Sequence, residues 1–361
     1  MFIVHKIVFP LNILFVLLLL GSYMAPWLNP ANYWMAAFLG LLHPFLLLIN
    51  FLFVIYWAIF LKLKVLYSLT AILCGFNHFT ATLKMTSSAK EDGNLLKIMS
   101  FNCNFFGYGM KHNITDTSPF FDLVKKEQPG IICFQEFMWE DNKRKNYINK
   151  CRQAMESKND YFFMGYRAMD TIHREYGQYI ISKYIIVNKG AIEFNTNKLN
   201  RCIWADIIYN NDTVRIYNAH LESIKLGDEE YKIMKDDEQR TGQIERTKSI
   251  ISKMKGAYQS RAIQAQLVSD HIQSCPYKTI LCGDFNDTPV SYAYATIAKN
   301  MKDAFVESGS GFSRTYAGVM PSFRIDYIMA DKKAQIYNYI LDEPYFSDHH
   351  LIQAAVTWDK K

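Results

Sequence analysis

The sequence predicts an α/β fold of two packed sheets flanked by helices, preceded by membrane-spanning helices. Residues 95–361 hold many short strand patterns, with charged, proline-free helical patterns embedded among them. This interleaving favours two packed sheets with outer helices over a doubly wound parallel sheet. Residues 1–83 are apolar and contain no Asp or Glu, which is the composition of membrane-spanning segments.

The N-terminal region, residues 1–83, is expected to form two or three transmembrane helices, near residues 7–25, 34–60 and 65–83. A helix needs about 20 apolar residues to cross roughly 30 Å of hydrocarbon, and no fully charged side chain occurs from Ile7 to Leu61. The segment Pro26–Pro30 predicts a turn. The third stretch is less apolar. A cleaved signal peptide is the alternative for the first stretch, but a second long apolar stretch follows at once and no clear cleavage site separates them.

Lysine placement predicts the orientation. Lys6 precedes the first stretch, and Lys62 and Lys64 follow the second. The positive-inside rule places these lysines in the cytoplasm. With three spans, the chain is an integral membrane protein with its soluble domain on the outer face. With two spans, that domain stays in the cytoplasm. Residues 84–94 form a short polar linker that holds the domain, residues 95–361, close to the membrane.

Charge and cysteine content exclude some classes of protein. Five of the 40 Lys and Arg residues lie in the first 90 positions, so the remaining 35 nearly balance the 34 Asp and Glu residues. A strongly basic nucleic-acid-binding surface is therefore not supported. The seven cysteines are irregularly spaced and include no CxxC pair, so neither a disulfide framework nor a zinc site follows.

Strand and helix patterns alternate along the soluble part. Helices are expected at Pro119–Glu127 and Asp141–Ser157, with one or two more within Asp228–Cys275. Strands are expected at Leu95–Asn102, Ile131–Phe137, Tyr161–Tyr166, Tyr179–Val187, Ala191–Phe194, Cys202–Tyr209, Thr213–His220, Lys278–Cys282, Arg324–Met329, Ala334–Ile340 and Leu351–Thr357.

Polar side chains recur where these strands begin or end. Strands anchored in a core hold such side chains rigidly, as a catalytic site requires. The set contains only Asp, Glu, Asn and His, and hard oxygen ligands suit Mg²⁺, Mn²⁺ or Ca²⁺. Its members are Asn102, Asn104, Glu136, His220, Asp284, Asn286, Asp326, Asp348 and His349.

Seven short motifs resemble, in order, those of the endonuclease/exonuclease/phosphatase superfamily, which includes DNase I, AP endonucleases, inositol-polyphosphate 5-phosphatases and neutral sphingomyelinases. Each tripeptide alone is a weak signal, but the ordered series spans nearly all of residues 95–358. The motifs are Ser100-Phe101-Asn102, Gln135-Glu136, Tyr176-Gly177, Asn218-Ala219-His220-Leu221, Gly283-Asp284-Phe285-Asn286, Arg324-Ile325-Asp326-Tyr327 and Ser347-Asp348-His349.

The resemblance implies a four-layer α/β/β/α sandwich of the DNase I type and a set of metal and substrate ligands. Glu136 would bind Mg²⁺ (or Mn²⁺), with Asn102 close to both metal and phosphate. Asp348 would complete the metal environment. Asn286 would hold a phosphate oxygen.

The resemblance also implies groups that move or hold protons. Asp284 would position or deprotonate the attacking water. His349 would contact the scissile phosphate as base or transition-state stabiliser, and Asp326 would orient it. His220 resembles the second histidine of DNase I and the sphingomyelinases, a candidate acid for the leaving oxygen.

These expectations together describe a membrane-anchored, divalent-metal-dependent phosphoester hydrolase that uses in-line attack by water. Its substrate would be a nucleic acid, as for a nuclease, or a phospholipid, as for a phosphodiesterase of the sphingomyelinase type. A non-catalytic membrane scaffold that keeps the fold is the alternative from another class, although a scaffold does not require Glu136, Asp284 and His349 together. No protein partner can be inferred from the sequence.

Overall fold

The computed structural model describes residues 2–84, 95–107, 116–139, 144–157, 159–167, 175–195, 200–225, 243–318, 323–342 and 347–358. The chain divides into two compact units. The first contains Met1–Thr82, Ile224–Ile263 and Asp287–Thr296, and the second contains Leu83–Ser223, Gln264–Asn286 and Ile297–Lys361. Of the expected linker at 84–94, the structure describes only Lys84. Of the expected helical region Asp228–Cys275, residues 228–242 lie outside the described residues.

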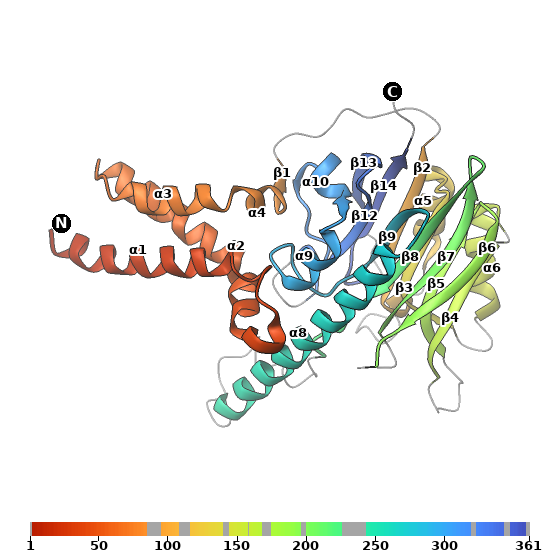
Figure 1. Ribbon diagram of the computed structural model, residues 1–361, viewed down its shortest axis with the longest axis horizontal. Helices are drawn as coiled ribbons and strands as arrows, with labels where there is room; N and C mark the ends of the chain where they lie inside the picture. The colour runs from red at the N-terminus through yellow and green to blue at the C-terminus, as the bar shows by residue number, and fades with distance from the viewer. Residues whose placement is uncertain are drawn as a thin grey trace. The chain divides into compact units, whose positions relative to one another are not determined.

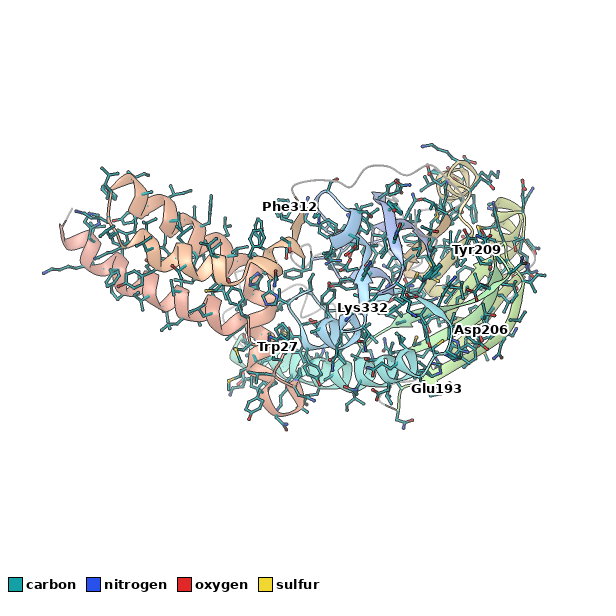
Figure 2. All side chains as sticks on the ribbon, turned by 45° about the horizontal axis from the view of Figure 1, so that its top comes forward. Trp27, Glu193, Asp206, Tyr209, Phe312 and Lys332 are labelled. Carbon is teal, nitrogen blue, oxygen red and sulfur yellow. The ribbon has the colours of Figure 1, made fainter. Side chains whose placement is uncertain are left out.

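Helices make up the described N-terminal region: α1 (Phe2–Ser22), α2 (Pro30–Ile59), α3 (Val65–Cys74) and α4 (Phe76–Thr80). The expected turn before Pro30 is present, because Pro30 is the first helical residue and the Asn29 side chain accepts a hydrogen bond from the Ala31 amide (2.9 Å). Trp27, in this turn, is 77% exposed (Figure 2). Among the described residues, α1 and α2 are the two helices long and apolar enough to cross a membrane.

A chain of buried polar side chains joins α1, α2 and α3. The Trp57 indole N–H donates to Asn12 Oδ1 (2.9 Å), Asn12 Nδ2 donates to the Ser68 hydroxyl (2.6 Å), and Ser68 donates to Asn50 Oδ1 (2.9 Å). Asn50 Nδ2 then donates to backbone carbonyls of α1 and α2. Hydrogen bonds of this kind hold apolar helices in register where hydrophobic burial contributes little.

Two six-stranded mixed sheets form the second unit (Figure 1). The first sheet has the order β13-β14-β2-β3-β5-β4 and contains β2 (Leu96–Asn102), β3 (Ile131–Trp139), β4 (Asn159–Arg167), β5 (Glu175–Ser182), β13 (Gln335–Asp342) and β14 (Leu351–Thr357). The second has the order β10-β12-β9-β8-β7-β6 and contains β6 (Ile186–Glu193), β7 (Arg201–Tyr209), β8 (Asp212–His220), β9 (Lys278–Asp284), β10 (Met301–Asp303) and β12 (Asp326–Asp331). A separate two-stranded pair joins β1 (Leu83–Lys84) to β11 (Gly311–Phe312).

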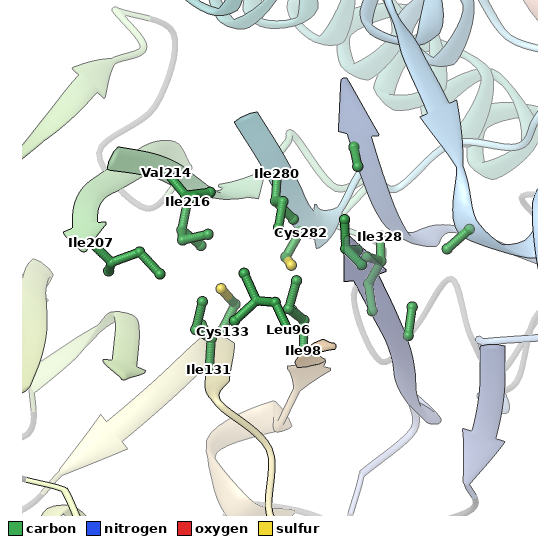
Figure 3. Packing of buried hydrophobic residues seen from close by; sticks show 14 of the residues in the cluster. Leu96, Ile98, Ile131, Cys133, Ile207, Val214, Ile216, Ile280, Cys282 and Ile328 are labelled. Carbon is green, nitrogen blue, oxygen red and sulfur yellow. The ribbon is translucent and has the colours of Figure 1, made fainter. Parts of the chain in front are cut away.

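The main core lies between the two sheets, and period-two alternation directs side chains into it. Leu96 and Ile98 of β2 face this core with Cys133 of β3, and Ile216 and Cys282 approach them from the second sheet (Figure 3). The intervening residues of β2 and β3 point to the opposite face, which is why both strands read as continuous apolar runs.

Helices cover the outer faces. The helices α5 (Ser118–Glu127) and α6 (Arg144–Met155) pack Phe120, Val124 and Met155 against the outer face of the first sheet, over Phe134 of β3. On the second sheet, the end of α8 (Gln243–Gln273) places His271 against Tyr217 (2.9 Å from Nδ1 to the hydroxyl). This helix–sheet–sheet–helix order confirms the expected four-layer sandwich. Two further short helices are α9 (Tyr292–Ala298) and α10 (Ala304–Ser308).

One expected strand is two strands. The pattern Tyr179–Val187 predicts a single strand, but β5 ends at Ser182 and β6 begins at Ile186, in the other sheet. Backbone and side-chain hydrogen bonds turn the chain here, because the Lys183 amide donates to Gly130 O (2.8 Å) and the Tyr184 amide donates to Ser182 Oγ (3.0 Å). An apolar run does not mark the residue at which a chain crosses between sheets.

Candidate active site

Strand direction explains why the predicted site residues meet. The parallel strands β2 and β3 both end at one edge of the first sheet, where the antiparallel β14 begins. In the second sheet, the parallel strands β8 and β9 end together and the antiparallel β12 begins beside them. Asp284 pairs in register with both His220 and Asp326. The sequence scatters these residues over more than a hundred positions, and the strand order gathers them.

Glu136 owes its position to a strand irregularity. The pairing of β3 with β5 shifts between Phe134 and Phe137, and Glu136 has a φ of 51° within that shift. A positive φ is costly for a residue other than glycine, because its side chain then crowds the backbone. The bulge turns the Glu136 carboxylate toward the second sheet rather than along the regular alternation of β3.

Direct contacts join the two sheets at the site. Asn102 Nδ2 donates to Asp284 Oδ2 (3.0 Å) and lies 3.4 Å from Glu136 Oε1. His220 Nε2 lies 3.6 Å from Glu136 Oε1 and 3.8 Å from Asp284 Oδ2. One amide, two carboxylates and an imidazole therefore share a single polar centre at the end of the sandwich.

His349 and Asp326 form a buried carboxylate–imidazole pair. His349 Nδ1 lies 3.0 Å from Asp326 Oδ2, and Nε2 lies 3.8 Å from Asp284 Oδ2. Burial alone would lower the pKa of His349, but the carboxylates of Asp326 and Asp284 outweigh it and raise this pKa to about 10. The ring is therefore protonated at neutral pH, donates through Nδ1 to Asp326, and directs the second N–H toward Asp284.

The carboxylates are crowded enough to resist ionisation. Burial, together with the charges of Asp348 and Asp284, raises the pKa of Glu136 to about 7 against the opposing effect of His349. Burial also raises the pKa of Asp284, and Asp326 adds to this effect. Carboxylates brought together against their own repulsion are the expected environment for a bound cation.

Asn286 and Asp348 lie at the rim of the same centre. Asn286 Nδ2 donates to Leu221 O (3.0 Å) and to Asp284 Oδ2 (3.2 Å), so both of its amide hydrogens have partners. Holding a phosphate oxygen would require Asn286 to release one of them. Asp348 Oδ1 accepts a short hydrogen bond from Asn104 Nδ2 (2.6 Å), which links Asn104 to the site.

Two residues that support the site carry no recognisable sequence signal. Thr315 Oγ1 accepts hydrogen bonds from the Ile325 and Asp326 amides (2.9 and 3.0 Å), which fixes the start of β12. The Tyr316 ring packs edge-on against His349, with the ring centroids 5.2 Å apart. Both lie in a loop with no periodic pattern, so only the folded chain brings them to the histidine.

Two groups of side chains could hold a cation. Asp284, Asp326 and His349 each offer an atom within 4.8 Å of the others. The second group is Glu136 and Asn102, whose Oε1 and Nδ2 atoms lie 3.4 Å apart, with Asp348, whose charge raises the pKa of Glu136. A protonated imidazole has no lone pair for a metal, and the pKa of His349 is about 10. The Glu136 group instead offers carboxylate and amide oxygens, which are hard donors suited to Mg²⁺ or Mn²⁺.

Comparison with sequence families finds two matches. A sequence model described as the Endonuclease/Exonuclease/phosphatase family matches residues 99–349. A second, described as a domain of unknown function (DUF8431), matches residues 5–82. No curated protein matches the chain significantly.

Solved structures share the sandwich fold at low sequence identity. An endonuclease/exonuclease/phosphatase from Beutenbergia cavernae is 14% identical with a TM-score of 0.54, covering 73% of this chain and 71% of its own. The human Nocturnin catalytic domain with bound sulfate is 17% identical (TM-score 0.53; coverage 74% and 95%). TDP2 from D. rerio complexed with a single-strand DNA product is 16% identical (TM-score 0.51; coverage 73% and 100%).

Proposed function

Since the chain belongs to the Endonuclease/Exonuclease/phosphatase family, we propose that it is a divalent-metal-dependent phosphodiesterase attached to a membrane. The observation that carries the proposal is the buried meeting of Glu136, Asn102 and Asp284 with the His349–Asp326 pair. These groups provide cation ligands, a water-orienting carboxylate and a protonated donor within a single centre. In-line hydrolysis of a phosphoester requires each of these functions.

The side chains divide the chemistry among themselves. Glu136, Asn102 and Asp348 would hold Mg²⁺ or Mn²⁺, which neutralises charge on phosphate oxygens when it is bound. Asp284 would orient the attacking water, with Asn102 and Asn286 fixing its carboxylate by hydrogen bonds of 3.0 and 3.2 Å. His349 would stabilise charge on the phosphate through its Nε2–H.

The leaving oxygen needs a proton, and His220 is suited to supply it. The His220 side chain is buried, and its Nε2 lies 3.6 Å from Glu136 Oε1 and 3.8 Å from Asp284 Oδ2. The site then holds an acceptor for the proton of the attacking water, Asp284, and a donor for the leaving oxygen, His220, as in-line hydrolysis requires.

Hydrolysis of bis-p-nitrophenyl phosphate tests the proposal. We expect the purified full chain to hydrolyse it when Mg²⁺ or Mn²⁺ is present, and to lose that activity on chelation and regain it when metal is restored. A screen of DNA, RNA and sphingomyelin under the same conditions identifies the natural class. The TDP2 complex with DNA product favours a nucleic acid, and the apolar helices favour a phospholipid. A chain that binds metal but hydrolyses none of these would be a scaffold.

The apolar helices support a membrane location with the catalytic domain on the outer face. Contacts between Asn12 and Trp57 and between Ser22 and His43 show that α1 and α2 pair antiparallel. Lys6 and Lys62 therefore lie at the same end of the bundle. At the opposite end, Gln259 of α8 donates to Ala31 O (3.4 Å). From the positive-inside rule we infer that α8 lies on the non-cytoplasmic side, which requires a third membrane crossing between Lys64 and the catalytic domain.

Reporter fusions test this topology. A reporter that works only outside the cytoplasm is expected to be active when fused after Lys361. The same reporter inserted after Lys64 is expected to be inactive, because Lys62 and Lys64 mark the cytoplasmic end. A reverse pattern would overturn the assigned orientation, and activity at both positions would contradict a membrane crossing between Lys64 and the catalytic domain.

A further inference from the structure

The first three turns of α2 continue beyond the helix that pairs with it. The last residue of α1, Ser22, meets His43 (3.1 Å), so residues 30–42 of α2 extend beyond this contact, with a break in the helical backbone at Tyr33. At a rise of 1.5 Å per residue, the helical part from 34 to 42 is about 14 Å long. Most of its residues are apolar, and they pack against two other segments of the chain.

Within the same compact unit, the extension packs against α8. Ala37 belongs to a buried cluster with Met254 and Tyr258. The Phe38 ring meets the Tyr258 ring edge-on at 5.6 Å, and the Lys255 ammonium lies 5.6 Å from the centre of the Trp34 ring. These contacts fix one face of α2 on α8.

A second contact joins the extension to the segment Asp287–Thr296. A Cβ atom built on Gly40 would lie 2.3 Å from the carbonyl oxygen of Val290 and 2.7 Å from Ala25 Cβ. Val290 is 2% exposed. The helix backbone therefore approaches the segment backbone as closely as only glycine permits, and any side chain at position 40 must displace one of them.

The same segment is fixed on its other side by a buried ion pair. Arg261 of α8 donates to Asp287 Oδ2 at 3.0 Å, and the two residues are 1% and 5% exposed. In the chain, Asp287 follows directly after Asn286 and three residues after Asp284. The backbone that leaves the active site is therefore held at Asp287 by α8 and at Val290 by α2.

We propose that this α2 extension positions the active-site loop, with Gly40 and Arg261 as positioning residues. The apolar N-terminal helices then help to position the active-site loop, in addition to attaching the chain to a membrane. This inference rests on the proposed phosphodiesterase function. It states that displacing Val290 moves Asp284 and Asn286, because only five residues separate the contact with Gly40 from Asp284.

The test is Gly40→Leu in the full chain, purified in lipid nanodiscs. Gly256→Leu on α8 is the matched control, since a Cβ at Gly256 meets no atom within 4 Å. Hydrolysis of bis-p-nitrophenyl phosphate with Mn²⁺ gives kcat and KM, and amide hydrogen exchange reports on residues 284–296. We expect Gly40→Leu to lower kcat about tenfold or more with little change in KM, and to speed exchange in that segment. Gly256→Leu is expected to match the wild type in both.

Gly40→Ala is a second, milder variant for the case that Gly40→Leu does not fold. Its single methyl group still meets the Val290 carbonyl, so we expect an intermediate loss of kcat. Wild-type kcat and exchange in both Gly40 variants would overturn the inference. So would a loss of kcat in Gly40→Leu with unchanged exchange in residues 284–296. A wild type that hydrolyses no phosphoester would instead refute the proposed function, while the exchange comparison still reports on the contact.

Discussion

Replacing His349 by Ala is expected to lower kcat for phosphodiester hydrolysis by about 10²–10⁴-fold, the usual contribution of a positioned acid–base group. His349 is 6% exposed, is protonated by the influence of Asp326 and Asp284, and has its Nε2 beside Asp284. The variant loses both a hydrogen-bond donor and a positive charge from a site where the transition state gains negative charge. Initial rates with bis-p-nitrophenyl phosphate and Mn²⁺ measure the effect.

His350→Ala is the control, since it removes the same ring from the next residue. We expect its kcat to stay within a few-fold of the wild type. The role assigned to His349 would be refuted by equal kcat values for wild type and His349→Ala. Equal losses in the two histidine variants would show that the loop, rather than the His349 ring, matters.

Glu136→Gln is expected to raise the Mn²⁺ concentration needed for half-maximal activity by well over tenfold. The substitution keeps the shape of the side chain but removes the charge of the proposed ligand, which sits at the register shift in β3 beside Asn102 and His220. Titration of activity with Mn²⁺, and of Mn²⁺ binding by its electron paramagnetic resonance signal, measure the change. A Mn²⁺ titration that overlays the wild type would remove Glu136 from the metal site.

The melting temperature of Glu136→Gln shows whether weaker Mn²⁺ activation comes from the lost charge or from misfolding. In the metal-free chain, burial and the charges of Asp348 and Asp284 disfavour the ionised form of Glu136 and raise its pKa. Removing that charge relieves repulsion, so the melting temperature of metal-free Glu136→Gln should be no lower than that of the wild type. A marked fall in melting temperature would assign Glu136 a structural role.

Many strands of the sandwich can be predicted from the sequence because their apolar residues follow regular patterns. The pattern at Leu351–Thr357 predicts β14 to the residue, and Ile131–Phe137 and Thr213–His220 predict most of β3 and β8. Their apolar residues alternate or run continuously because both faces of each sheet are covered. The position of a polar residue at a strand end is local information, so the members of the candidate site are also visible in the sequence.

Contacts between residues that are far apart in the sequence are harder to predict. Nothing local indicates that Glu136 has a positive φ, because this follows from the pairing of β3 with β5. The crossing between sheets after Ser182 depends on Gly130, some fifty residues earlier. Thr315 and Tyr316 support Asp326 and His349 from a loop without a pattern. These features arise from tertiary packing, which overrides local propensity.

In the N-terminal helices, too, the sequence predicts the elements but not their contacts. Their hydropathy predicts membrane spans, and α2 is long enough to cross. Hydropathy alone does not reveal that its first three turns contact α8, or that Gly40 meets Val290. The expected third span, residues 65–83, stays a prediction, since α3 and α4 are two short helices separated at Gly75.

A diffraction experiment on crystals of the full chain soaked in Mn²⁺ would test most directly whether side chains from both sheets share one cation site. We predict an anomalous scattering peak in direct contact with the Glu136 carboxylate, next to Asn102 and Asp284. A Mn²⁺ peak bound elsewhere in the second unit, with nothing beside Glu136, would contradict that account of the chemistry.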